Sequence, residues 1–226
     1  ATGRRWLEFR RTLLKRHSLR TILQLPPYSF FETEAHCFIL ILDKGAPSVS
    51  KKIKLVRLYE TGEVSEPIYV DPKRVEVRFD HSYHSIKHCQ AIAPTSLRQI
   101  GADIRRGSLT SVQRKVAEGF VFHTGDFPTD LSPISLMSEM PVFDAKRTLV
   151  VEAGDILMAR VDRDLHNKAA LVKAGRAVIT DCVYRIRVPE RHRMTVFEAL
   201  TSERGRAKVR AATKGVGARL IGKGDL

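Results

Sequence analysis

The chain has 226 residues, enough to bury the core of one large or two small domains, and its 39 Lys and Arg against 25 Asp and Glu give a net charge of +14. An excess of this size attracts polyanions, which favours nucleic acid over an anionic membrane or a plain basic surface. The three cysteines form no Cys-x-x-Cys pair, and no apolar run has the length of a membrane span. We therefore expect a cytoplasmic protein without disulfides, thiolate zinc sites or membrane contact.

The first elements of the chain predict a helix and two strands. Apolar residues recur at helical spacing from Arg4 to His17, with basic residues between them. A strand is expected from Leu19 to Pro26, and a second one from Cys37 to Leu42, closed by Asp43-Lys44-Gly45. The chain begins Ala1-Thr2-Gly3 without an initiator Met, which suggests a piece of a longer polypeptide.

This opening segment resembles the last helix and strands of the catalytic domain in adenine-specific DNA methyltransferases of the type I modification-subunit kind. The residues that carry the resemblance are Arg11, Leu13, Leu14, Leu19, Ile22, Leu23, Leu25, Pro26, Phe30 or Phe31, Thr33, Ile39–Leu42, Lys44 and Gly45. The resemblance implies that residues 1–60 are the edge of a methyltransferase-like sheet. It also implies that S-adenosylmethionine and the target adenine bind upstream of this segment. We therefore expect the cofactor in an associated catalytic domain and none in this chain.

A short run imitates the adenine-binding loop of that family, which reads Asn/Asp-Pro-Pro-Tyr/Phe. Here the run is Leu25-Pro26-Pro27-Tyr28. The first residue must offer a side-chain oxygen to the target amine, which Leu25 cannot do. We expect no catalytic residue in this chain.

A further strand and a linker are expected next. Residues 51–59 alternate apolar and basic side chains as a strand does, whereas residues 61–89 carry the prolines and short apolar pairs of an interdomain connector. Within the connector, His81, His84 and His88 would share one side of a helix, and imidazole is a zinc ligand. Only Asp80 and Cys89 could complete such a site, so we favour solvated histidines or histidines that touch phosphate.

The second domain is expected from residue 90 to residue 226. Residues 100–110 are predicted to form a basic, glycine-interrupted loop, and glycine allows close approach to a phosphate. The candidate DNA contacts in this loop are Arg105, Arg106, Ser108 and Thr110. A solvated turn is the alternative. A strand from Phe120 that ends in Thr124-Gly125-Asp126 follows the loop.

The centre of this domain is the turn Glu152-Ala153-Gly154-Asp155 and the apolar run Ile156–Val161, predicted to be a buried strand. Strands are also expected at residues 178–182 and 183–188, the latter with its arginines on an open face. A cationic loop at residues 162–168 follows the central strand. The candidate base-reading residues, at the end of the strand and on the loop, are Arg160, Arg163, His166 and Asn167. Lys168 on the same loop is a candidate phosphate contact.

The last segment predicts one long helix and a glycine turn. Thr195 and Glu198 fit a capping box, and the helix is expected to run to about Ala212 with basic residues on its exposed surface. Arg204 on this helix and Lys214 in the turn after it are candidate phosphate contacts.

The ordered set Gly154–Arg160, Ala177–Asp181 and Val183–Arg187 resembles the target-recognition domain of type I restriction-modification specificity subunits. The resemblance implies an α/β chain in which a methyltransferase-like sheet edge precedes a mixed α/β target-recognition domain. It implies sequence-specific recognition of double-stranded DNA, with a methyltransferase catalytic domain or subunit as partner. The alternatives are an assembly module that does not read DNA and a fragment of an active adenine-specific methyltransferase.

Overall fold

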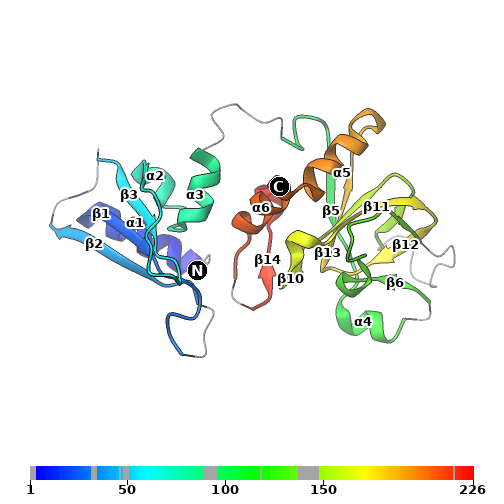
Figure 1. Ribbon diagram of the computed structural model, residues 1–226. Coiled ribbons are helices and arrows are strands. Elements are labelled where there is room, and N and C mark those ends of the chain that lie inside the picture. Colours follow the sequence, from blue (N-terminus) through cyan, green and yellow to red (C-terminus); the bar gives the residue numbers. More distant parts are fainter. Residues whose placement is uncertain are drawn as a thin grey trace. The chain divides into compact units, whose positions relative to one another are not determined.

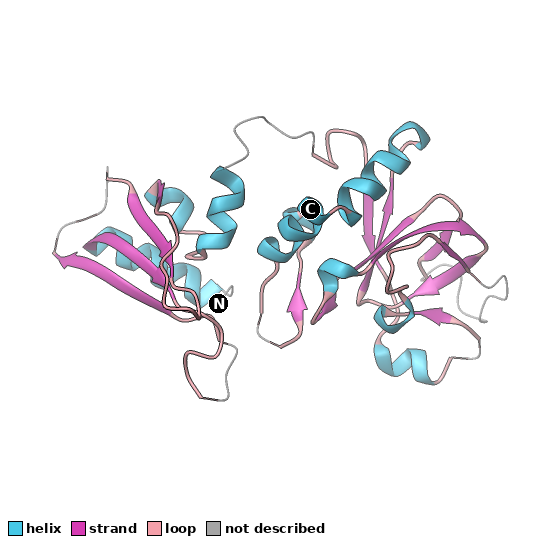
Figure 2. Cartoon of the chain, in the orientation of Figure 1, coloured by secondary structure: helices cyan, strands magenta, loops and turns pink. Residues whose placement is uncertain are grey.

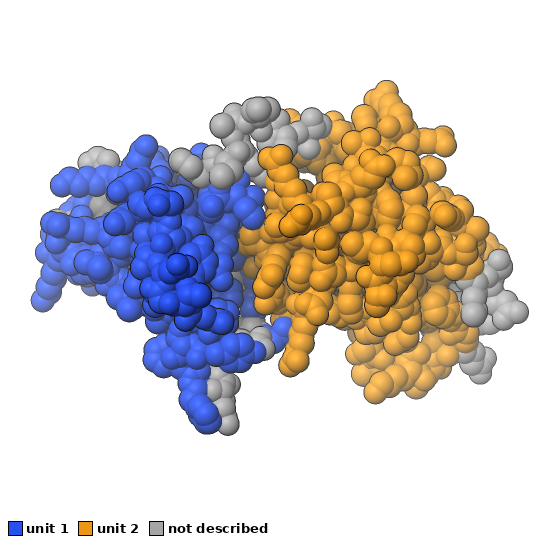
Figure 3. Space-filling view, in the orientation of Figure 1, with its two compact units in different colours: residues 1–93, 214–217 blue, residues 94–213, 218–226 orange. Residues whose placement is uncertain are grey.

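The computed structural model describes residues 4–31, 35–45, 47, 51–88, 96–117, 119–136, 148–215 and 217–226. The chain divides into two compact units (Figure 3). Unit 1 comprises residues 1–93 and 214–217, and unit 2 comprises residues 94–213 and 218–226. Each unit has its own apolar core, so each is described separately.

Unit 1 is built on a four-stranded mixed sheet in the order β2-β1-β3-β4 (Figure 1). Its strands are β1 (His17–Gln24), β2 (Phe38–Lys44), β3 (Ile53–Arg57) and β4 (Ile68–Val70). Strand β1 pairs antiparallel with β2 and parallel with β3, and β3 pairs antiparallel with β4. The helices of the unit are α1 (Arg4–Arg16), α2 (Pro72–Val75) and α3 (His81–His88). The helix and first three strands agree with the prediction to within two residues at each end.

One face of this sheet is covered and the other is partly open. The covered face holds Ile22, Ile53 and Leu55 in a core to which α1 contributes Leu13 and Leu14. Side chains alternate across a strand, so the intervening residues of β2 point away from that core. On the open face Ile39 and Ile41 are about half exposed, and β2 is an edge strand.

The prediction of a linker at residues 61–89 is wrong for much of this range, because its short apolar pairs belong to the sheet and core of unit 1. Strand β4 completes the sheet, Val75 of α2 is fully buried in the core, and α3 packs against β3 and β4. Asp71 caps α2 by accepting a hydrogen bond from the Lys73 amide at 2.9 Å. Pro72 at the start of the helix, which looked like a connector signal, is ordinary at that position.

Unit 2 contains three sheets, with helices along them (Figure 2). The five-stranded sheet has the order β5-β13-β9-β11-β7, formed by Asp103–Arg106, Val183–Arg187, Ile156–Ala159, Ala169–Ala174 and Ile134–Ser135. The three-stranded sheet has the order β6-β12-β8, formed by Val121–Phe122, Arg176–Ile179 and Val150–Glu152. Strands β10 (Val161–Asp162) and β14 (Arg219–Leu220) form an antiparallel pair. The helices are α4 (Ser111–Lys115), α5 (Arg193–Thr201) and α6 (Glu203–Ala212).

The predicted central strand is confirmed as β9, which is buried along its whole length between β13 and β11. A strand covered on both faces reads as a continuous apolar run, which is how the sequence marked it. The turn that leads into β9 is also confirmed. Gly154 has φ +93°, a conformation that favours glycine, and Asp155 accepts the Glu152 amide at 3.0 Å.

Three expectations about the local structure of unit 2 are wrong. Residues 103–106 form β5 rather than a loop, because they pair antiparallel with β13. Strand β13 is buried from Val183 to Ile186 rather than half-buried, and Arg185 on its predicted open face is covered. The single terminal helix is two helices, because Ser202 ends α5 and caps α6 by accepting the Gly205 amide at 3.1 Å. Gly205 allows the close packing of this junction, since a Cβ there would lie 1.7 Å from the Ala199 carbonyl oxygen.

The chain is therefore a mixed α/β protein, as the fold class predicted. Within the described residues, every helix is too short or too polar to cross a membrane.

Candidate nucleic-acid interface

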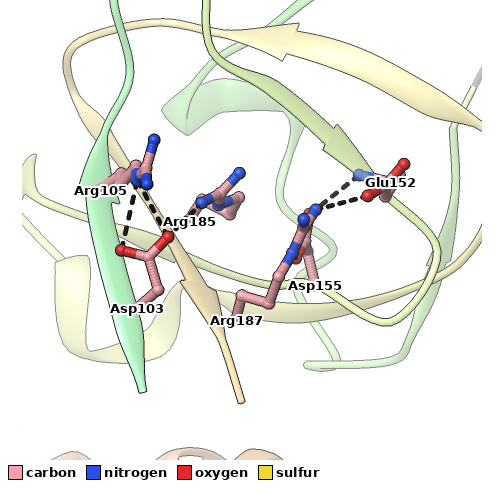
Figure 4. A network of polar contacts seen from close by, with 6 residues as sticks. All are labelled: Asp103, Arg105, Glu152, Asp155, Arg185 and Arg187. Atoms are coloured by element: carbon pink, nitrogen blue, oxygen red, sulfur yellow. Dashed lines mark hydrogen bonds and ion pairs between the residues drawn. The ribbon is translucent and has the colours of Figure 1, made fainter. Parts of the chain in front are cut away.

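The two arginines predicted to contact phosphate from residues 100–110 lie on β5 and are already paired with carboxylates. Asp103 accepts from Arg105 at 2.9 Å and from Arg185 of the neighbouring strand at 2.5 Å (Figure 4). Burial alone would raise the pKa of Asp103, but the hydrogen bonds and charges of Arg105 and Arg185 outweigh it and lower the pKa. Arg106 donates to Asp181 at 2.5 Å. Both β5 arginines stay half exposed, but a phosphate would have to compete with these carboxylates.

Ser108 and Thr110 have local structural roles. The Ser108 hydroxyl accepts the Leu149 amide at 3.0 Å. Thr110 caps α4, where its hydroxyl accepts the Gln113 amide at 3.2 Å and its own amide donates to the Gln113 side chain at 2.9 Å. Gly107 before them is needed for packing rather than for a ligand, because a Cβ there would lie 2.1 Å from the Thr180 carbonyl oxygen.

A second ion-pair network holds the turn before β9. Asp155 is 1% exposed, and it accepts from Arg187 of β13 at 2.6 and 2.8 Å (Figure 4). Arg187 also donates to the exposed Glu152 at 2.7 Å. The hydrogen bonds that Arg187 donates to Asp155 raise the pKa of Arg187, so the guanidinium stays charged. This network connects β13 to the β8–β9 turn (Figure 4).

The loop at residues 162–168 is anchored to the protein at its second half. Leu165 is fully buried, and the Lys168 ammonium donates to the Thr124 carbonyl at 2.9 Å and to Asp162 at 2.8 Å. The Asn167 side-chain oxygen accepts from Arg206 of α6 at 3.0 Å. The assignments of Asn167 to a base and of Lys168 to a phosphate are therefore not supported, since both side chains are used to fix the loop.

The remaining two arginines of this region differ in availability. Arg160 is half buried and donates to the Asp181 carbonyl at 3.0 Å, so it stabilises the β12–β13 turn. Arg163 is exposed at the tip of the loop and has no hydrogen bond or ion pair to any residue in the described part of the chain. Of the residues predicted to read bases, Arg163 is the one that the geometry leaves accessible.

His166 sits in a cationic environment. Burial lowers its pKa, and Arg210, Arg219 and Arg206 lower it further against the opposing charge of Asp164. Arg206 and Arg210 come from α6, which packs against the turn at His166. Arg219 comes from β14, and the pairing of β14 with β10 brings it to the loop. The sequence pattern had marked the basic surface of the last helix but had not joined Arg210 and Arg219 to His166. The four-residue spacing of Arg206 and Arg210 could have indicated a shared face, but the position of β14 could not be read from it.

Arg204 and Lys214 belong to different units. Arg204 is exposed in the first turn of α6. Lys214 lies in the 214–217 segment, which belongs to unit 1, so it is not grouped with the other candidate contacts.

The histidines of α3 serve the core of unit 1. The His81 ring nitrogen Nε2 lies 3.2 Å from the Ser65 hydroxyl, and His84 Nε2 donates to the Arg78 carbonyl oxygen at 2.8 Å. Both rings are buried, and burial lowers the pKa of His81. The His88 side chain and Cys89 lie outside the described residues. Within the described part of the chain no three His, Cys, Asp or Glu side chains come together as a metal site.

No protein-family model and no curated protein matches this chain. Among solved structures, the chain is similar to the type IIG restriction endonuclease BpuSI, with 10% sequence identity and a TM-score of 0.42. The alignment covers 100% of this chain and 38% of that enzyme, so the chain spans less than half the length of its structural neighbour. A similarity at this level does not indicate the function of the chain.

Proposed function

We propose that this chain recognises a sequence in double-stranded DNA as part of an adenine-methylating restriction-modification system. Unit 2 serves as the target-recognition domain. Unit 1 joins a methyltransferase catalytic domain or subunit, which holds S-adenosylmethionine and performs the transfer. The motif resemblances and the net charge of +14 support this assignment.

The observation that carries the proposal is the presentation of Arg163. Its guanidinium is exposed and unpaired among the described residues, while the loop on either side is held by Leu165 in the core and by the Lys168 contacts. A fixed loop that displays one free guanidinium suits bidentate recognition of a guanine edge in the major groove. Arg204, exposed on α6, supplies charge that sets the register on the phosphates without reading sequence.

The test is a binding selection on random duplex DNA, followed by affinity measurements on the selected and on random sequences. Arg163→Ala should relax the preference at one base pair, because a good bidentate contact is worth about 1–3 kcal/mol of discrimination. Arg204→Ala should weaken all sequences alike. If both variants lose affinity equally on selected and random duplex, this division of roles is refuted.

A second function, assembly without DNA reading, is favoured by the apolar surface of unit 1. Ile39 and Ile41 are half exposed on the open face of the sheet, and Trp6 and Phe9 form an exposed edge-to-face pair on α1. Exposed apolar groups of this kind are typical of surfaces that contact another protein. An assembly module would bind a methyltransferase subunit but would show no salt-dependent affinity for duplex DNA. Titration of the chain with S-adenosylmethionine by calorimetry separates both proposals from an active methyltransferase fragment, which would bind the cofactor.

A further inference from the structure

Four cationic or ionisable side chains gather at one place in unit 2, and we call them the α6 cluster: His166, Arg206, Arg210 and Arg219. They come from three elements, namely the 3-10 turn Leu165–Asn167, α6 and β14. The turn packs against α6, and the Arg206–Asn167 hydrogen bond of 3.0 Å joins the two. Strand β14 lies beside β10 at the start of the same loop (Figure 1), and the strand register places Arg219 opposite Asp162.

Among the described residues, no carboxylate forms an ion pair with an arginine of the cluster. Asp162, the acid nearest in the strand register, is bound to Lys168 at 2.8 Å. Asp164, which acts on His166 electrostatically, forms no ion pair with any described residue. Arg206 and Arg210 lie four residues apart on α6, and like charges at this spacing repel by a few tenths of a kcal/mol. The fold therefore tolerates a like-charge arrangement that brings the free protein no stability.

Two nitrogen atoms of the cluster are enclosed and have no hydrogen-bond partner in the part of the chain that the structure describes. These are Nδ1 of His166 and Nε of Arg206. Buried donors and acceptors are nearly always satisfied in folded proteins, and a group that is not needs a reason, of which an absent ligand or ion is one. The cluster thus combines uncompensated positive charge with unsatisfied hydrogen-bonding groups. A bound oxyanion would supply both the negative charge and the hydrogen-bond partners.

We propose that the α6 cluster is a phosphate-binding site that clamps one or two phosphodiester groups of the DNA backbone. The inference rests on the proposed function, because a DNA-bound chain is the state in which the site is filled. It changes the role of His166 from reading a base to contacting backbone. It also assigns Arg206, Arg210 and Arg219 to register-setting contacts, with Arg163 at the tip of the same loop left to read sequence. Arginine suits this role because its planar guanidinium can bind a phosphate through two parallel hydrogen bonds.

The electrostatics of His166 give the site a signature. In the free protein its pKa lies below the ordinary value, first because of burial and then because of the three arginines, with Asp164 opposing them. The strand β9, which also contacts this turn, is wholly apolar. A bound phosphate places negative charge beside the ring and stabilises the imidazolium. The pKa of His166 should therefore rise when duplex DNA binds, and the complex should tighten as the pH falls below about 6.5.

The test compares two double variants that lose the same charge. Arg210→Ala with Arg219→Ala removes two members of the cluster, whereas Lys173→Ala with Arg176→Ala removes two exposed cations at the β11–β12 turn of the same unit. Affinity for a random duplex is measured by fluorescence anisotropy from about 0.05 to 0.3 M salt. Each lost phosphate contact lowers the slope of log affinity against log salt by about 0.9, which is roughly an eightfold loss of affinity at about 0.1 M salt.

We expect the cluster variant to lose nearly two units of salt slope and about 60-fold in affinity at about 0.1 M salt, and the control to lose much less. Arg210→Lys with Arg219→Lys, which keeps the charge, should recover most of the slope and shows that folding is not the cause. Equal effects of the two alanine pairs, or a His166 pKa that does not rise on DNA binding by NMR titration, would overturn the site. Absence of salt-dependent affinity in the unmodified chain would instead overturn the proposed function itself.

Discussion

Unit 2 holds two groups of arginines that differ in what surrounds them. On the five-stranded sheet, Arg105 and Arg185 share Asp103, Arg106 pairs with Asp181, and Arg187 pairs with Asp155 and Glu152. In the α6 cluster the three arginines act electrostatically on His166, and they form no ion pair with any carboxylate in the described part of the chain. The net charge of the chain therefore says little about where a polyanion can bind, because many of its arginines are already neutralised.

The sheet shows why its arginines need their carboxylates. Arg185 and Arg105 lie directly opposite each other in the β13–β5 register, an arrangement in which like charges are destabilising. Asp103, two residues before Arg105, accepts from both guanidinium groups and removes the repulsion. No acid has this role between Arg206 and Arg210 among the residues described. The sheet arginines thus have their counter-ions within the fold, whereas on our proposal the arginines of the α6 cluster gain theirs when phosphate binds.

The largest effect is expected from breaking the sheet network at its buried member. Asp155→Ala should lower the free energy of unfolding by about 3 kcal/mol, because it leaves the Glu152 amide unsatisfied and deprives Arg187 of its buried partner. Glu152→Ala is the matched control. Its side chain is 61% exposed, so the loss of its ion pair should cost less than about 1 kcal/mol. Urea unfolding measures both values, and similar losses for the two variants would contradict the assigned difference in burial.

Acid should act on the sheet network through Asp103. The folded-state pKa of this carboxyl is lowered, so its contribution to stability is fully present above the ordinary value of about 4 and is lost as the pH falls from there through the lower folded-state pKa. Asp103→Asn should therefore lower the free energy of unfolding by about 1 kcal/mol at pH 7, since Arg185 is largely buried and loses a charged partner.

The difference between unmodified chain and Asp103→Asn should shrink as the pH falls below about 4, because a protonated Asp103 resembles asparagine. Comparing the two proteins at each pH cancels the titration of all other groups. A difference that stays constant from pH 7 to pH 3 would mean that the charge of Asp103 is not what holds Arg105 and Arg185.

The sequence predicted those elements whose pattern is local. The helix at the start of the chain and the buried strand β9 were visible from spacing and from a continuous apolar run. The break between α5 and α6 was missed because Ser202 and Gly205 can also occur within a single continuous helix. Strand β5 was missed for a different reason, since its two arginines suggest a solvated loop until β13 and Asp103 are seen beside them.

The site was predictable only in part. The sequence indicated the loop at residues 162–168, with Arg163 and His166 on it, and the basic surface of the last helix. It could not show that Lys168 and Asn167 are used to hold that loop, because their partners Thr124 and Arg206 are 44 and 39 residues away in the chain. Ion pairs between distant strands decide which charges remain free, and they depend on sheet register rather than on any local pattern.

The smallest effect concerns stability, and it tests the α6 cluster without any ligand. Arg210→Gln keeps nearly the same helix propensity but removes one of the mutually repelling charges. It should leave the free energy of unfolding unchanged or raise it by about 0.2–0.5 kcal/mol at low salt, and the gain should disappear near 0.5 M salt, where surface charges are screened. Lys173→Gln, with the same change in net charge, is the control and should gain less. Destabilisation by Arg210→Gln that does not respond to salt would show Arg210 to be a structural contact like the sheet arginines. A gain in stability together with a loss of DNA affinity is the result expected of a residue kept for binding at the expense of the fold.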